Sequence, residues 1–164
     1  MTGEAVTAAA ASAAKKVAYL RQTPLGYLLH SGMAGVYVGF GIVLIFAIGA
    51  PLAAAGSPFT KLAMGASFGV ALSLVIFAGS ELFTGNNMVM AVGLLKRTVT
   101  PQGLGAVWVL SFIGNLAGSL GLAWLVAQSG VLGSAPALEF VQKTAATKMN
   151  LPFDELFVRG ILCN

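Results

Sequence analysis

The chain has 164 residues, of which 57% are hydrophobic and 9% charged, and its formal net charge is +4 at pH 7. Soluble domains usually carry about a quarter charged residues, so this composition excludes a soluble globular protein. The basic residues flank apolar stretches and form no basic run, so the positive charge indicates membrane topology and predicts no nucleic-acid partner.

Residues 1–22 predict an amphipathic helix that lies at the membrane surface on the cytoplasmic side. Its apolar positions share one helical face: Val6, Ala10, Ala13, Val17 and Leu20. A signal peptide fits poorly, because Glu4 stands where a positive region should be and the apolar stretch is mostly alanine. A disordered alanine-rich leader is the alternative.

Residues 23–128 are expected to form a three-helix membrane repeat. The first span runs from about Leu25 to Ala50, and the third covers roughly 104–128. The second element begins near Lys61, breaks at 81–87 and resumes as a half-helix to about Leu95. The uncharged stretches 22–60, 62–80, 82–95 and 98–138 together accommodate about three spans of the ~20 residues that cross a bilayer. Three Gly-xxx-Gly pairs predict close helix packing: Gly35 and Gly39, Gly65 and Gly69, Gly114 and Gly118.

The most informative feature is the polar, turn-forming run at 81–87, which lies between two uncharged apolar stretches, 62–80 and 88–95. A non-helical break at membrane depth persists only where protein or a water-filled cavity covers it. Short, interrupted spans of this kind indicate transport sites. The break therefore predicts a channel or transporter whose pore lies at these residues.

Individual residues of the break suggest how it would meet a solute. Gly85 permits the left-handed geometry of a sharp turn, and Asn86 or Asn87 would cap a half-helix starting near Met88. Its free N–H groups and positive dipole end would attract an anion. Thr84 adds a hydroxyl donor, although helix-end threonines also bond backbone carbonyls.

Three apolar residues and one carboxylate complete the candidate site. Phe68 and Leu72 share a helical face and, with Phe83, could form a dry constriction; each could equally be a packing residue. Glu81 is an ionisable group beside an intramembrane break. We expect it to accept hydrogen bonds from the loop backbone and hold its shape, because an anion path disfavours a bare carboxylate.

The C-terminal part divides into an external connection, residues 129–152, and the start of a fourth transmembrane helix, residues 153–164. Asn150 as cap, Pro152 and then Asp154 occur in the order typical of a helix start. The distribution of Lys and Arg places the N-terminus in the cytoplasm.

Five segments carry a resemblance to a known family: residues 79–86 (GSELFTGN), 24–26 (PLG), 31–39 (SGMAGVYVG), 114–119 (GNLAGS) and 159–164 (RGILCN). They are similar to the formate/nitrite transporter family, most of all to its nitrite-channel branch. The likeness extends over residues 20–164. It implies an all-α, aquaporin-like bundle of six spanning helices, built as two inverted three-helix repeats with broken second and fifth helices.

The resemblance also implies site residues and an assembly. Thr84 would lie in the loop on the cytoplasmic side of the pore, and Phe68, Leu72 and Phe83 would line its narrow stretches. Lys148 matches a basic residue near the outer mouth, and Asn164 a pore asparagine close to a central histidine on helix five. That histidine is absent here, so we expect a chain truncated after its first repeat. A homopentamer in the inner membrane, with one pore per protomer, is implied.

The predicted function is a multi-pass channel or transporter for small monovalent anions, nitrite first and formate or hydrosulfide next, acting passively or with a proton. The alternatives are an aquaporin-like neutral-solute channel and a non-conducting membrane interaction module. The sequence contains no metal-binding cluster, nucleophile–base pair or phosphate loop, so we expect no enzyme, metal or cofactor.

Overall fold

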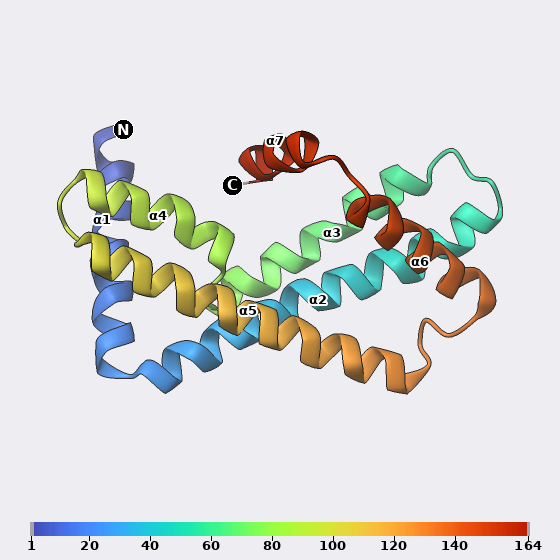
Figure 1. The fold of residues 1–164 in the computed structure, drawn as a ribbon, viewed down its shortest axis with the longest axis horizontal. Coiled ribbons are helices and arrows are strands. Elements are labelled where there is room, and N and C mark those ends of the chain that lie inside the picture. Colours follow the sequence, from blue (N-terminus) through green and yellow to red (C-terminus); the bar gives the residue numbers. More distant parts are fainter. Residues whose placement is uncertain (1, 164) are drawn as a thin grey trace. The chain divides into compact units, whose positions relative to one another are not determined.

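The computed structural model describes residues 2–163, which form seven α-helices (Figure 1). They are α1 Thr2–Gln22, α2 Pro24–Ala54, α3 Thr60–Phe77, α4 Phe83–Leu95, α5 Pro101–Ser129, α6 Ala135–Met149 and α7 Phe153–Cys163. Within the described residues, α2, α3 and α5 are long and apolar enough to cross a membrane, and α4 is a shorter apolar helix. The predicted all-α membrane fold is confirmed.

The chain divides into two compact units. The first contains residues 2–35 and 79–118, and the second contains residues 36–78 and 119–163. The first unit therefore holds α1, the start of α2, α4 and most of α5. The second holds the rest of α2 and α5 together with α3, α6 and α7.

In the first unit, α1 (blue) packs against α4 (Figure 1). Ala13 and Leu20 on α1 join Tyr27, Met90 and Val107 in one buried apolar cluster. The apolar face of α1 was predicted to lie on the membrane surface. In the structure, protein covers the central part of this face at Ala13 and Leu20, while Val6 near the start stays 38% exposed. The position of α1 at the membrane surface stays a prediction.

The helices α2 and α5 approach closely where glycines face each other in the first unit. A Cβ atom on Gly35 would overlap the backbone carbonyl of Asn115, and one on Gly118 would overlap the carbonyl of Gly32. Gly114 likewise abuts the side chain of Ser31. The predicted role of these glycines in close packing is confirmed.

In the second unit, α2 packs against α3 and α6. A Cβ atom on Gly41 would lie 2.5 Å from that of Ala71 on α3. The rings of Phe46 and Phe140 meet edge to face at 5.9 Å and join α2 to α6. The predicted glycine pair of α3 has no such role here, because nothing in the described chain lies within 4 Å of a Cβ placed on Gly65 or Gly69.

The interruption of the second span lies earlier than predicted. The helix α3 ends at Phe77 with Ala78 as its C-cap, and α4 begins at Phe83, so the break occupies residues 78–82 and not 81–87. Gly79, with φ +63°, takes the left-handed conformation that was predicted for Gly85. Gly85 lies inside α4.

The C-terminal part differs from its prediction in two details. Residues 129–152, predicted as an external connection, contain the helix α6 over most of their length. Asn150 is the C-cap of α6 and not the N-cap of the following helix. The next helix, α7, begins at Phe153 as expected, with Asp154 in its first turn. Asn164 lies outside the described residues.

Candidate functional site at the helix break

A single side chain, that of Asn115 on α5, bonds the break, the start of α4 and the helix α2. Its Oδ1 accepts a hydrogen bond from the backbone N–H of Phe83 at 2.9 Å. Its Nδ2 donates to the carbonyl oxygens of Glu81 and Ser31, each at 2.9 Å. The Asn115 side chain thus supplies hydrogen-bond partners to backbone groups where the interrupted helix offers none, as a break at membrane depth requires.

The carboxylate of Glu81 is the centre of a buried polar cluster. Lys16 on α1 donates to both of its oxygens, at 2.9 and 2.7 Å. The hydroxyl of Tyr27 and the amide of Asn86 each donate to Oε2 at 3.1 Å. Asn86 also donates to the Tyr27 oxygen at 3.1 Å. One carboxylate thus links α1, α2 and α4.

This cluster is largely buried and balanced in charge. The side chains of Lys16 and Glu81 are 19% and 9% exposed, so their opposite charges are largely desolvated together. In the described chain no buried side-chain nitrogen or oxygen lacks a hydrogen-bond partner. Glu81 therefore holds the break, but the prediction that it bonds the loop backbone is wrong: its carboxylate binds other side chains.

The helix α4 begins directly after the break, so the backbone N–H groups of its first turn face the break. The N-cap, Leu82, is extended and makes no side-chain cap, and the first helical bond runs from Asn86 N–H to the Leu82 carbonyl at 2.9 Å. The predicted caps, Asn86 and Asn87, lie inside the helix because Asn115 supplies the acceptor from α5. Half-buried Thr84 lies in this first turn, at the positive end of the helix dipole.

The structure brings only some of the predicted site residues together. Glu81 and Asn86 belong to the buried cluster, and the ring of Phe83 meets that of Phe112 edge to face at 5.4 Å. Asn86 is 1% exposed and serves the cluster. Thr84 and Gly85 lie in the first turn of α4 in the same unit. Three predicted residues belong to the second unit: Phe68 and Leu72 are exposed on α3, and Lys148 is exposed in the last turn of α6.

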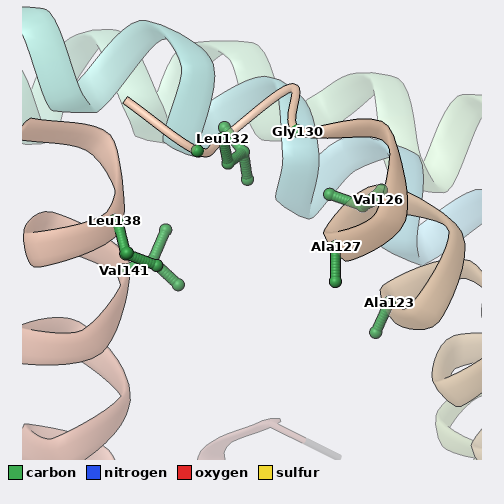
Figure 2. A pocket seen from close by; sticks show the side chains of 8 residues that line it. Ala123, Val126, Ala127, Gly130, Leu132, Leu138 and Val141 are labelled. Atoms are coloured by element: carbon green, nitrogen blue, oxygen red, sulfur yellow. The ribbon is translucent and has the colours of Figure 1, made fainter. Parts of the chain in front are cut away.

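An apolar pocket of about 380 Å³ lies in the second unit, where the end of α5 meets α6 (Figure 2). Its lining is aliphatic: Ala123, Val126, Ala127, Gly130, Leu132, Gly133, Leu138 and Val141. It contains none of the predicted pore residues and offers no charged side chain. Such a lining suits an apolar group and does not suit a small anion.

Three residues of the site were missed by sequence reasoning. Lys16 was interpreted only as a topology charge, and Tyr27 and Asn115 had no assigned role. Asn115 carried a usable signal, since an amide within the uncharged stretch 98–138 requires an internal partner in a membrane. Nothing near Lys16 in the sequence indicates that its partner is a glutamate 65 positions away.

The helices of membrane length and the interrupted span, held by a buried polar cluster, define a polytopic membrane protein. A model of the family described as formate/nitrite transporter matches residues 3–164. The chain belongs to that family, as its motifs predicted.

The relatives support the same assignment. The nitrite transporter NirC of Salmonella typhimurium is 39% identical over 164 residues, which is 100% of this chain and 60% of that protein. A probable formate transporter of Methanothermobacter thermautotrophicus is 39% identical over 174 residues, covering 94% of this chain and 63% of the relative. The solved structure of an FNT family ion channel matches with a TM-score of 0.82 at 38% identity, covering 92% of this chain and 59% of that one. The chain thus spans about 60% of the length of NirC.

Proposed function

We propose that this protein contributes the pore of a channel or transporter for small monovalent anions, with nitrite as the first candidate and formate or hydrosulfide next. The observation that carries the proposal is the first turn of α4. The backbone N–H groups of this turn come before the first helical hydrogen bond, and Thr84 is one of the residues that carry them. A helix N-terminus held at membrane depth is a natural site for an anion.

The buried cluster supports the same function, because it holds this turn without competing for the anion. The negative charge of Glu81 is matched by Lys16, and the Asn115 amide occupies the Phe83 N–H. The backbone N–H groups that remain for an anion in the first turn are those of Thr84 and Gly85, which follow Phe83. The printed names of two relatives, a nitrite and a probable formate transporter, favour a small anion as the solute.

Further features of the proposed path come from the family pattern. Phe68, Leu72 and Phe83 would form dry constrictions that select by size and wetting. Lys148 would concentrate anions at the outer mouth, and Asn164 would belong to the pore. The assembly would be a homopentamer in the inner membrane, with the N-terminus in the cytoplasm. Transport would be passive or coupled to a proton.

The test is anion flux into proteoliposomes that carry the protein expressed from its complete gene. Thr84→Ala should lower the nitrite flux roughly fivefold to tenfold, because one hydrogen bond to the solute is lost. Thr84→Ser, which keeps the hydroxyl, should retain most of the flux. Thr147→Ala serves as the matched control, because Thr147 is an exposed threonine on α6 that bonds only its own helix.

Two results would replace this proposal. Equal permeation of nitrite and of a neutral solute such as glycerol would indicate an aquaporin-like channel. Absence of any flux from correctly assembled protein would indicate the non-conducting interaction module. An unchanged flux in Thr84→Ala would remove Thr84 from the path.

A further inference from the structure

A second polar site lies in the first unit, away from the helix break. An open pocket of about 450 Å³ is formed by the end of α1 and the connection from α4 to α5. Ala14, Val17, Ala18 and Val99 supply an apolar wall, and Arg21, Gln22, Arg97, Thr98 and Thr100 supply polar groups. The pocket therefore combines an apolar surface with two guanidinium groups.

Among the residues that the structure describes, neither arginine of this pocket has an acidic partner. The first unit contains five Lys and Arg residues but only Glu4 and Glu81 as acids. Glu81 is occupied by Lys16, and the other ion pair in the described chain joins Arg159 to Glu155 in the second unit. Arg21 and Arg97 thus present unneutralised charge at one place, which favours an anion.

The backbone holds Arg97 in a conformation that arginine rarely adopts. Its φ is +57°, in the left-handed region. The N–H of Arg97 bonds the Leu94 carbonyl at 3.0 Å and the N–H of Thr98 bonds the Gly93 carbonyl at 2.9 Å, which is the Schellman motif that ends α4. Glycine is the usual residue at this position. An arginine in this conformation is strained relative to glycine, which indicates that its guanidinium has a role.

A side-chain hydrogen bond joins two walls of the pocket. The hydroxyl of Thr98 donates to the carbonyl of Ala10 at 2.9 Å and ties the α4–α5 connection to α1. The hydroxyl of Thr100 accepts a hydrogen bond from the N–H of Gly103 at 3.1 Å in the first turn of α5. The positive end of the α5 dipole therefore adds to the field of the two arginines.

The residues that line the pocket lie next to the ends of membrane-length helices, which places the pocket at the level of the membrane interface. Arg21 and Gln22 end α1, one residue before α2 begins, and Arg97 to Thr100 directly precede α5; α2 and α5 are both helices of membrane length. Basic pockets at the ends of spanning helices are suited to the head groups of anionic lipids. The apolar wall formed by Val17, Ala18 and Val99 suits the glycerol and the first methylene groups of such a lipid.

We propose that Arg21 and Arg97 form a binding site for the phosphate of an anionic membrane lipid. The guanidinium groups hold the phosphate oxygens, for which their planar donor geometry is suited, and the apolar wall holds the start of the acyl region. The site ties the end of α1 to the α4–α5 connection from the lipid side. This inference concerns lipid binding and does not depend on which solute the protein transports.

The test is lipid binding by the protein, purified in mild detergent and followed by native mass spectrometry and by the shift of the unfolding temperature. The probes are phosphatidylglycerol, zwitterionic phosphatidylcholine and inorganic phosphate. Wild type should bind phosphatidylglycerol in preference to the other two. Arg21→Gln and Arg97→Gly should each weaken this binding about fivefold, and the double variant more strongly.

Arg97→Gly separates a binding role from a structural one, because glycine suits the left-handed position. Its unfolding temperature without lipid should equal or exceed that of wild type while the lipid-dependent shift is lost. Lys96→Gln is the matched control, since it removes one positive charge at the neighbouring exposed position outside the pocket lining. It should leave the affinity within about twofold of wild type.

Several outcomes would overturn the proposal. Unchanged phosphatidylglycerol affinity in both arginine variants would remove the site. An equal loss in Lys96→Gln would mean diffuse surface charge and no defined pocket. Equal stabilisation by inorganic phosphate would indicate a site for free anions, and equal binding of phosphatidylcholine would show that the charge of the lipid is not recognised.

Discussion

Asn115 illustrates how one side chain makes an interrupted span possible. Its amide offers an acceptor to Phe83 N–H and donors to the carbonyls of Glu81 and Ser31. Asparagine alone among side chains of this size presents both functions in one plane. An apolar residue of similar size would leave these backbone groups without partners in a region that excludes water.

We therefore predict that Asn115→Leu destabilises the protein by about 2–4 kcal/mol, since each unpaired buried polar group costs roughly 1–3 kcal/mol and Asn115 is half-buried. The measurement is the free energy of unfolding in mild detergent. Gln102→Leu is the control, because it replaces an exposed amide on the same helix and should change stability by less than about 0.5 kcal/mol. Equal effects of the two substitutions would contradict the assigned role.

At the scale of elements, glycine decides which helices meet. Along α5, Gly114 and Gly118 face α2 so closely that a Cβ on Gly118 would overlap the Gly32 carbonyl. Gly121, one turn further along, has nothing within 4 Å of its Cβ position among the described residues. Gly118 therefore permits a close helix contact, whereas Gly121, three positions further along the same helix, does not take part in one.

This contrast gives a prediction for the crossing of α2 and α5. Gly118→Ala should destabilise the protein by about 1–3 kcal/mol, because backbone atoms must move apart to admit the methyl group. Gly121→Ala should be neutral or stabilise by up to about 1 kcal/mol, because alanine favours the helix and meets no neighbour. Thermal unfolding of both variants in the same detergent checks the pair. A stable Gly118→Ala variant would refute the close crossing.

For the whole molecule, the exposed surface is that of a membrane protein. Large apolar side chains such as Leu62, Ile76, Phe77 and Leu120 are at least 61% exposed on the spanning helices. In water such surfaces would associate, whereas hydrocarbon or further protein accommodates them. The membrane-length helices α2 and α5 contain no charged residue, and α3 contains only Lys61 in its first turn, so the charges flank the spans, which is the basis of the proposed orientation.

The proposed orientation predicts the reactivity of single cysteines. With Cys163→Ser as background, Lys148→Cys should react with a membrane-impermeant maleimide added outside intact cells. Lys96→Cys should react only after permeabilisation, because the N-terminal side is placed in the cytoplasm. Labelling in the reverse order would mean the opposite topology, and labelling of both from outside would contradict the spans themselves.

Local chemistry made much of this protein predictable from its sequence. The three helices of membrane length and an interrupted span follow from apolar runs and from glycine and proline, whose effects act over a few residues. The family followed from short motifs such as residues 79–86. The exact break was not predictable, because Gly79 and Gly85 are locally equivalent candidates for its turn.

Only the tertiary structure decided which distant groups meet. Lys16 pairs with Glu81, Asn115 replaces the expected asparagine caps of α4, and protein covers the central apolar face of α1. Each outcome depends on removing groups from water together, and the partner that satisfies a buried charge or backbone group can come from anywhere in the chain. Composition and periodicity determined that this chain enters a membrane, whereas long-range polar pairing determined how its broken helix is held.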